Sequence, residues 1–526
     1  MTNSFYVYTF YFTFIKTTNP THLWGNSRNF IMQQIHVSSE IGTLKRLLIH
    51  SPDGGIGKVI PEKAQAWLYD DIVDLEKMRQ EYDYYVRLLL YFLDPDKAIM
   101  LKEAQEQMPS GKRTNLYRPD KPEYFNSDKV IEVQFILTQL LEDEYARMRL
   151  ISAVCGIERC SHSDTEKLLQ LPSCELAKTL ISGIITEEDR YVFPPIPNLI
   201  FTRDTAVVVN DHLLITRPAT AARFRESVII THLAYYHFFG HDKGKSWHKI
   251  IEMTDEEDFF LLDEEMRQAR IVTIEGGDVM MIAPRHLIVG FSVRTSPHAI
   301  NQLINKLFDR ALVDTISVIK IPRKRDYMHI DTLFTMVKRN VWVLYGPLSE
   351  LELGTRYMRY YVHDILDPDD KAVGETLEIF QYDRHQADYR MRYDEQNPQP
   401  RYLEDLFTQI CRRDFGCQEP MKFVYSGGDK FPYNEREQWT DSCNLLALKE
   451  GVVIGYDRNH KTADSFEKDL GFNIVHARDL LAAFDAEVSN PSQISDTLIL
   501  LPSSELSRAR GGSHCMSMPL WHEEVK

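Results

Sequence analysis

The sequence lacks the features that define several large protein classes. Its seven cysteines include no C-x-x-C pair, so neither a structural zinc site nor a disulfide framework is expected, and a reducing compartment is favoured. It has no run of about 18 apolar residues, as a membrane-spanning helix would need. Positive charge is in deficit, because 61 Lys and Arg face 77 Asp and Glu and give a net charge of −16. We therefore expect a cytoplasmic protein with neither a membrane nor a nucleic-acid partner.

The 526 residues have the composition of a globular protein, with 43% hydrophobic and 26% charged residues. Residues 5–15 are aromatic and apolar, but no basic region precedes them and no small-residue cleavage site follows, so a signal peptide is not expected. We expect residues 1–31 to be a poorly structured N-terminal extension and residues 32–526 to form a single catalytic domain. The sequence does not decide between Met1 and Met32 as the start of translation, and it leaves the oligomeric state open.

Four segments repeat one pattern, in which a polar opening precedes two short apolar runs separated by a turn. Apolar runs of this length, bounded by turn residues, predict strands, and each pair predicts a β-hairpin. The predicted strand pairs are 206–209 with 213–215, 279–282 with 287–289, 333–337 with 341–345, and 445–448 with 452–456.

Amphipathic helical patterns at 296–308 and 463–470 follow two of these hairpins. Residues 41–51 and 510–520 resemble partial copies of the same unit. Repeated hairpin-plus-helix modules predict a pseudo-symmetric α/β architecture closed around an axis, where the polar openings would converge. Two stretches interrupt the repeat and are expected to be largely helical insertions covering the modules: about 70–190, with long periodic runs at 76–92 and 130–153, and about 350–418.

The loop Arg510-Gly-Gly-Ser-His-Cys-Met-Ser holds the strongest candidate for chemistry. Two glycines before Cys515 allow a close approach of the backbone to a ligand and present the thiol in a tight loop. A thiolate is an effective nucleophile when a nearby base activates it. The alternative is that Cys515 is a small buried apolar residue, which is the usual role of a free cysteine.

Two further motifs place acids and a histidine at module openings. In His329-x-Asp331 the two side chains share one face of an extended segment, and a histidine beside a carboxylate can act as a general base. A hydrogen-bonded structural pair is equally consistent with this spacing. The motif Glu275-Gly-Gly-Asp278 places two carboxylates around a flexible turn, although such a turn alone is more often a hairpin entry.

Asp204 opens the first hairpin, and Arg223 follows it by the same 19 residues that separate Glu275 from Arg294. Equal offsets in two modules suggest an acid and an arginine presented from equivalent places. Guanidinium groups and carboxylates form paired hydrogen bonds with each other. A site with both kinds of side chain fits a zwitterion with a cationic end and an anionic end, such as free arginine.

Two other patterns do not support a cofactor. Residues 240–246, GHDKGKS, are one residue short of the phosphate-binding G-x-x-x-x-G-K-[ST] spacing, so nucleotide binding is not expected. The histidines show no H-E-x-x-H or comparable spacing, so no metal is expected either.

Taken together, five motifs in this order resemble the arginine deiminases of the guanidino-group-modifying (amidinotransferase) superfamily. They are PNLIFTRD ending at Asp204, EGGD at 275–278, GFSVRT around Arg294, MHIDTLFT around His329, and RGGSHCMSMP around Cys515. Segments 41–52, 68–71 and 437–444 add support. The resemblance implies a five-module α/β propeller that hydrolyses L-arginine to L-citrulline and ammonia through a covalent amidino-cysteine, without a cofactor.

The resemblance also implies roles for single residues. Cys515 would be the nucleophile, His329 the general acid and base, and Glu275 its carboxylate partner. Asp204 and Asp331 would grip the guanidinium. The substrate-binding residues would be Asn198, Arg223, Asp278, Arg294 and Arg510.

Other functions stay open at this point. An amidinotransferase, an arginine dihydrolase and a methylated-arginine hydrolase share the thiol, histidine and acids, so the central motifs do not separate them. A propeller protein that binds arginine without chemistry is a further alternative, against which the complete set of reactive side chains argues.

Overall fold

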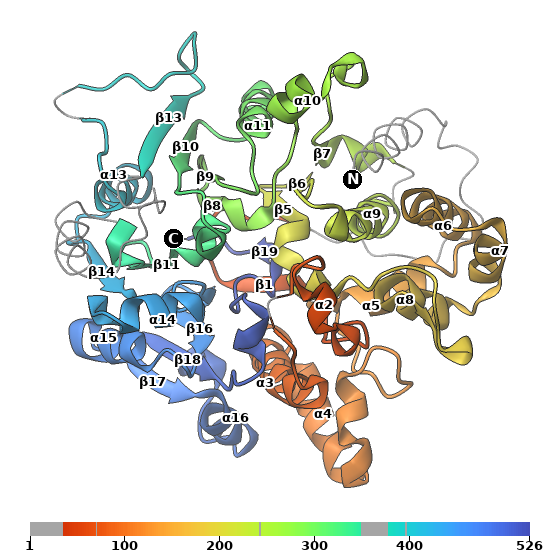
Figure 1. Cartoon of the computed structure of the whole chain (residues 1–526). Helices are drawn as coiled ribbons and strands as arrows, with labels where there is room; N and C mark the ends of the chain where they lie inside the picture. The colour runs from red at the N-terminus through yellow and green to blue at the C-terminus, as the bar shows by residue number, and fades with distance from the viewer. Residues whose placement is uncertain (1–34, 70, 241–243, 349–376, 395–396, 526) are drawn as a thin grey trace.

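The chain is a mixed α/β protein in which short sheets and their helices lie around the middle of the molecule (Figure 1). The computed structural model describes residues 35–69, 71–240, 244–348, 377–394 and 397–525. The predicted extension at 1–31, Met32 and part of the insertion at 350–418 lie outside the described residues. Among the described helices, none combines the length and the apolar composition that a bilayer crossing requires.

All four predicted hairpins are confirmed as antiparallel strand pairs. The turn between the first two strands places Asn210 at a φ of 52°, a left-handed conformation that asparagine tolerates better than most residues. The pairs are β5 (Ala206–Val209) with β6 (His212–Ile215), β8 (Val279–Ala283) with β9 (His286–Phe291), β11 (Phe334–Lys338) with β12 (Val341–Leu344), and β15 (Leu446–Lys449) with β16 (Val452–Tyr456).

The two partial copies at the ends of the repeat combine into one sheet. Strand β1 (Leu44–Ile49) pairs antiparallel with β19 (Met518–His522), so that Leu48 lies opposite Met518. The fifth antiparallel pair is therefore built from segments more than 450 residues apart. Figure 1 shows these two strands near the middle of the view.

Each of the five antiparallel pairs carries a third strand that runs parallel to its second member. These strands are β2 (Val130–Glu132) beside β1, β7 (Ile250–Glu252) beside β6, β10 (Thr315–Lys320) beside β9, β14 (Lys422–Tyr425) beside β12, and β18 (Thr497–Leu501) beside β16. Two sheets gain a fourth strand, β13 (Glu378–Asp383) and β17 (Asn473–His476), and β3 (Ile184–Ile185) pairs separately with β4 (Arg190–Tyr191).

Helices connect the second strand of each sheet to its parallel third strand, as such crossovers require. Helices α11 and α15 confirm the two helices predicted at 296–308 and 463–470. Ser296 caps α11 by accepting a hydrogen bond from the Ala299 amide. The crossover helices are α9 (Phe224–Leu233), α11 (Pro297–Asp309), α13 (Leu403–Phe415), α15 (His460–Leu470) and α16 (Ala477–Asp485), while α10 (Glu264–Arg270) and α14 (Tyr433–Trp439) join consecutive sheets.

The stretch 70–190 is mostly helical but contains a strand of the first sheet. Its first half crosses from β1 to β2 through α3 and α4, and its second half packs α5 and α6 against α9. The run at 130–153 is divided because Glu132 and Asp143 each cap a new helix. The helices are α2 (Pro61–Ala64), α3 (Leu75–Leu93), α4 (Pro95–Gln107), α5 (Val133–Leu140), α6 (Glu144–Glu158), α7 (His162–Gln170) and α8 (Ser173–Ser182).

The described part of the stretch 350–418 also mixes strand and helix. Strand β13 joins β10 on the edge of the β8–β9–β10 sheet, and α13 leads directly into β14. Trp342 on β12 stacks on Phe407 of α13 with ring centroids 3.8 Å apart, which fixes this helix on its sheet. The helical prediction for this stretch is therefore incomplete, because an edge strand lies within it.

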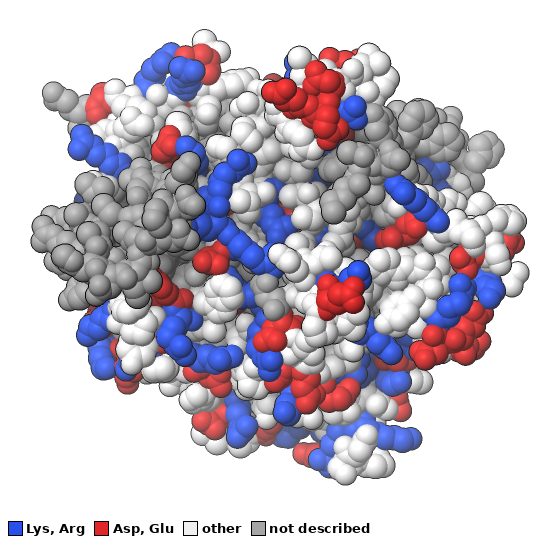
Figure 2. Space-filling view, viewed as in Figure 1, with Lys and Arg blue, Asp and Glu red and all other residues white. Residues whose placement is uncertain are grey.

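Charge of both signs is spread over the face of the molecule in Figure 2. The densest acidic group in this view lies over α10, where Glu264 and Glu265 open the helix. Acidic residues in a first helical turn are favoured by the helix dipole.

Candidate active site

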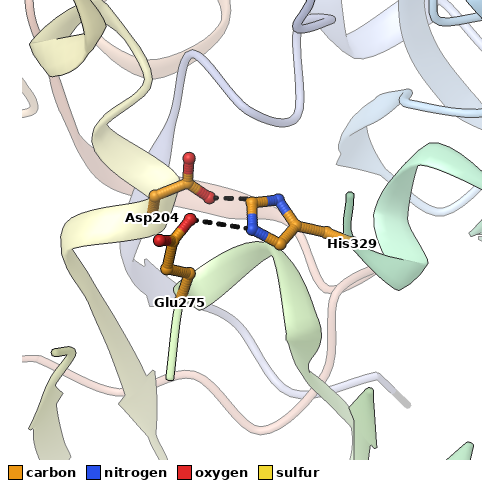
Figure 3. A group of neighbouring side chains, drawn as sticks. All are labelled: Asp204, Glu275 and His329. Atoms are coloured by element: carbon orange, nitrogen blue, oxygen red, sulfur yellow. Dashed lines mark hydrogen bonds and ion pairs between the residues drawn. The ribbon is translucent and has the colours of Figure 1, made fainter. Parts of the chain in front are cut away.

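Three side chains that open three different sheets meet in one cluster. Asp204 lies in a short turn before β5, and Glu275 and His329 precede the equivalent turns before β8 and β11. His329 Nε2 lies 3.0 Å from Glu275 Oε2, and His329 Nδ1 lies 3.6 Å from Asp204 Oδ1 (Figure 3). The polar openings therefore converge, as the repeat pattern predicted.

His329 is surrounded by negative charge. Burial disfavours the protonated ring, but the carboxylates of Asp204, Glu275 and Asp278 outweigh it and raise the pKa of His329 to about 10. Burial likewise opposes ionisation of Glu275, yet the charge of Arg294 and the hydrogen bond to His329 hold the pKa of Glu275 well below its usual range. At neutral pH the pair is an imidazolium beside a carboxylate, which is ready to give up a proton.

The thiol of Cys515 lies in a second cluster, with Asp331 and Asn444. Cys515 Sγ is 3.4 Å from Asp331 Oδ2, and Asn444 Nδ2 donates to the sulfur at 3.1 Å. The Cys515 amide donates to Asn444 Oδ1 at 3.0 Å, so one amide side chain holds both the backbone and the sulfur of this residue. Cys515 is 5% exposed.

The two clusters belong to one site. Asp331 follows His329 by two residues in the same turn. Burial raises the pKa of Asp331, but the hydrogen bond from His514 and the charge of His329 outweigh it and lower the pKa below its usual value. Asp204, in turn, is among the charges that act on Cys515. The five predicted catalytic residues therefore form one electrostatically linked group.

One acceptor in this group is open. Asp331 is fully buried, and its Oδ1 has no hydrogen-bond partner among the residues that the structure describes. A buried carboxylate oxygen without a partner is costly, and an N–H donor from a ligand would relieve that cost.

The three predicted arginines differ in how far their charge is already neutralised. Arg223 is the most paired, with Nη1 2.6 Å from Asp204 Oδ2 and Nη2 2.8 Å from Glu226 Oε2. Arg294 Nη1 lies 3.8 Å from Glu275 Oε1. Arg223 is therefore the least able of the three to take a ligand carboxylate.

Arg510 is the arginine with the most open guanidinium. Its Cζ lies 3.5 Å from the centre of the Trp439 ring, and Nη2 donates to the Asp326 carbonyl at 3.4 Å. Its Nε and Nη1 are buried and have no partner among the described residues. Arg510 also borders a cavity of 990 Å³ that Trp439, Arg458 and Arg508 help to line, so an anion has a route to it.

Two other predicted substrate-binding residues are engaged with the protein. Asn198 Nδ2 donates to the Trp67 carbonyl at 2.6 Å. Asp278 is fully buried and accepts hydrogen bonds from the hydroxyls of Ser292 and Thr295 and from the Ile330 amide. This pattern ties the segment that carries His329 to the β8–β9 hairpin, which is a structural use of Asp278 rather than a contact for a ligand.

Sequence comparison assigns the chain to a family. A family model described as "Arginine deiminase" matches residues 170–522. The chain belongs to the arginine deiminase family. All ten predicted site residues lie within the matched range.

Curated relatives named arginine deiminase cover almost the whole chain. The protein of Bacillus cytotoxicus is 26% identical over 93% of this chain and 99% of its own length, and that of Listeria innocua is 27% identical over 94% and 99%. Solved structures also match. An amidinotransferase of Microseira wollei from the saxitoxin pathway has a TM-score of 0.44 at 12% identity, covering 93% of this chain and 98% of its own. An adduct of dimethylarginine dimethylaminohydrolase has a TM-score of 0.37 at 13% identity, covering 90% and 99%.

Three residues of this arginine deiminase family member contact the site and were not predicted to do so. They are Asn444, which holds Cys515, His514, which lies 3.0 Å from Asp331, and Glu40, which lies 3.4 Å from His514. Asn444 ends a segment that already resembled the family, and His514 directly precedes the predicted nucleophile. Glu40 gave no local signal, because its partners lie more than 150 residues away along the chain.

The acid–base cluster also has the composition of a metal site. One ligand atom from each of Asp204, Glu275 and His329 lies within 4.8 Å of the others, and these ligand types suit Zn²⁺. Arg223 already brings a cation to this place, with Nη1 2.6 Å from Asp204 and 3.6 Å from Glu275. The arginine and the imidazolium thus balance the carboxylates of this family member with its own side chains.

The protonation of Cys515 gives a first testable prediction. Burial, together with the charges of Asp331 and Asp204, raises the pKa of the Cys515 thiol well above its usual range. In the unliganded protein, we expect the thiolate absorbance of Cys515 to appear only above about pH 9, later than the ~8.5 of a free thiol. The measurement is an ultraviolet pH titration of the unsubstituted protein minus that of Cys515→Ser. A difference signal that titrates below about pH 8 would contradict this reading.

Proposed function

We propose that the protein is an arginine deiminase that hydrolyses L-arginine to L-citrulline and ammonia. The observation that carries the proposal is the convergence of Cys515, His329, Glu275, Asp204 and Asp331 from separate modules into one linked group. Membership of the arginine deiminase family supports the same activity.

The substrate guanidinium binds beside the thiol and the open carboxylate oxygen. Asp331 Oδ1 accepts one of its N–H groups, and Asp204 accepts another from the opposite side. Each charge-assisted hydrogen bond contributes about 1.5–3 kcal/mol. The arriving cation offsets the negative charge of both carboxylates, which lowers the pKa of Cys515 and releases the thiol proton.

The reaction then proceeds through two addition steps. The Cys515 thiolate attacks the guanidinium carbon, and the His329 imidazolium protonates the departing amine, so that ammonia leaves and an amidino-thioether remains. His329, now neutral, takes a proton from water as the oxygen adds to the same carbon. Collapse of that adduct expels the thiolate and yields citrulline, while Glu275 stabilises the imidazolium that forms again.

The other end of the substrate carries a carboxylate and an amine. Arg510 and Arg294 hold the carboxylate, since their guanidinium groups are the least neutralised of the three arginines. Arg223 positions Asp204, and Asn198 lies behind Arg223, whose Nη2 donates to its carbonyl at 3.3 Å.

The architecture extends this proposal to the whole chain. The five sheets share one order, an antiparallel pair followed by a parallel third strand, and this supports a five-module pseudo-symmetric α/β propeller. We place residues 32–526 in one catalytic domain, with the helical stretches at about 70–190 and 350–418 covering its modules.

Product analysis tests the proposed activity. Purified protein supplied with L-arginine should release citrulline and ammonia in a ratio of one to one. Ornithine with two ammonias would indicate a dihydrolase, and transfer of the amidino group to an added amine would indicate an amidinotransferase. Absence of any product from arginine would exclude the proposal.

Substitution of Arg510 tests recognition of the carboxylate end. Because lysine cannot form the paired contact of a guanidinium with a carboxylate, Arg510→Lys should raise the KM for arginine about tenfold to hundredfold and change kcat less. Agmatine, which has no carboxylate, should inhibit the variant and the unsubstituted protein with constants within about twofold of each other. An equal loss for agmatine would contradict a contact with the carboxylate.

A further inference from the structure

A chain of buried polar side chains lies behind Asp331, on the side away from His329. His514 Nδ1 is 3.0 Å from Asp331 Oδ2, and His514 Nε2 is 3.4 Å from Glu40 Oε2. Glu40 is held by both terminal nitrogens of Arg203, at 3.2 and 3.3 Å. His514, Glu40 and Arg203 are between 2% and 7% exposed, so water does not screen these contacts.

The chain determines how the two oxygens of Asp331 are used. Oδ2 receives both His514 Nδ1 and the Cys515 thiol, whereas Oδ1 is left without a described partner. Because Asp331 is ionised and only accepts, His514 must carry its proton on Nδ1 to donate here. The carboxylate therefore cannot rotate about its axis without breaking the bond from His514.

The far end of the chain is anchored firmly. Burial opposes ionisation of Glu40, but the charge of Arg203 and the hydrogen bond from His514 outweigh it and hold the pKa of Glu40 well below its usual range. The backbone of Arg203 also donates to the Cys515 carbonyl at 3.1 Å. The ion pair thus supports both the ring of His514 and the loop that carries the thiol.

We propose that His514 is a positioning residue, which the Glu40–Arg203 ion pair holds in place so that Asp331 turns one oxygen to the thiol and the other to the substrate cation. The inference rests on the proposed function for its kinetic consequences. Its geometric part concerns only how Cys515 and Asp331 present themselves to a cation.

Two isomeric amides at position 514 separate positioning from mere filling of space. In His514→Asn the amide nitrogen takes the place of Nδ1 and still reaches Asp331. In His514→Gln it takes the place of Nε2, which faces Glu40 and not Asp331. Both variants keep a polar side chain of similar volume.

The first readout does not depend on turnover. Cys515 is alkylated with chloroacetamidine, a cation, and with chloroacetamide, its neutral counterpart, and the ratio of the two rates measures the grip of the carboxylates on an amidinium. We expect His514→Gln to lower this ratio about tenfold or more, and His514→Asn to keep it within about threefold of the unsubstituted protein.

The second readout is the kinetics with arginine. Misplacement of a group by about 1 Å can cost a factor of about 100 in rate, so kcat should fall by about that factor in His514→Gln and by less than tenfold in His514→Asn. His232→Asn is the matched control, since His232 is equally buried but contacts only the Val228 carbonyl of its own helix. This control should leave both readouts unchanged.

The outcomes are distinguishable. Equal alkylation ratios in the Asn and Gln variants would overturn the positioning role, whether or not arginine is turned over. If the unsubstituted protein fails to turn over arginine while the two variants still differ in the alkylation ratio, the proposed function fails and the positioning role stands. If His514→Gln does not fold, Glu40→Gln replaces it, and an unchanged ratio in that variant would overturn the anchoring by the ion pair.

Discussion

Replacing Cys515 with serine is expected to lower citrulline formation by about 10⁴-fold or more. A serine hydroxyl is far less acidic than a thiol, and no described side chain within reach of residue 515 is a base suited to activate it. The same carboxylates that raise the pKa of the thiol would disfavour an alkoxide even more. The measurement is kcat with saturating arginine, followed by mass spectrometry of the quenched protein for an amidino adduct, which should be absent from the variant.

The control for this substitution is Cys174→Ser. Cys174 lies partly exposed on α8, away from the site, and its replacement should leave kcat within about twofold. Cys515→Ser should also melt within a few degrees of the unsubstituted protein, because one sulfur is exchanged for an oxygen that Asn444 can still contact. Turnover by Cys515→Ser within tenfold of the unsubstituted rate would refute covalent catalysis by this residue.

Replacing His329 with glutamine is expected to lower kcat by about 10²–10⁴-fold, the usual contribution of general acid–base catalysis. Glutamine keeps a hydrogen-bonding group near Glu275 but has no proton to give to the leaving ammonia. Both halves of the reaction would lose their proton carrier, so a burst of ammonia without citrulline is not expected. Rapid-quench measurement of ammonia and citrulline in a single turnover checks this point.

The matched control is His212→Gln on β6, where His212 Nδ1 lies 2.8 Å from the carboxylate of Asp211, far from the site. It should leave kcat unchanged. Folding raises the pKa of His329 from 6.5 to about 10, so the protonated ring stabilises the fold fully below pH 6.5. That stabilisation declines as the pH rises and is lost above about pH 10. The melting-temperature gap between the unsubstituted protein and His329→Gln should close over this range, and a gap that widens with pH would contradict the assignment.

Much of the fold could be predicted because its pattern is local. Each of the four hairpins consists of two apolar runs flanking a turn such as Asn210-Asp211, and neighbouring residues alone specify that unit. The pairing of β1 with β19 was visible only as two incomplete copies, since no local pattern states that the two ends of the repeat belong to one sheet.

The elements that were not predicted are short or depend on distant partners. Strand β2 has three residues inside a helical stretch, and β13 pairs with β10 across the intervening β11 and β12. Their strand character comes from the edge that they complete, not from their own periodicity.

The candidate site divides in the same way. Cys515, His329, Glu275, Asp204 and Asp331 stand in motifs that could be read from the sequence, and the structure brings them together, although their roles stay predictions. Glu40 and Asn444 act through partners that only the folded chain supplies. The ion pairs that already engage Arg223 are likewise a property of the fold.

The pairing of β1 with β19 has a consequence for how the protein comes to life on the ribosome. Cys515 lies three residues before β19, and Glu40 lies four residues before β1, so the first-made and last-made parts of the polypeptide must join before the nucleophile is seated. Nascent chains that stop short of this final strand would carry every acid and the histidine, yet they would have no reactive sulfur. Synthesis itself therefore withholds chemistry until translation of the protein is essentially finished.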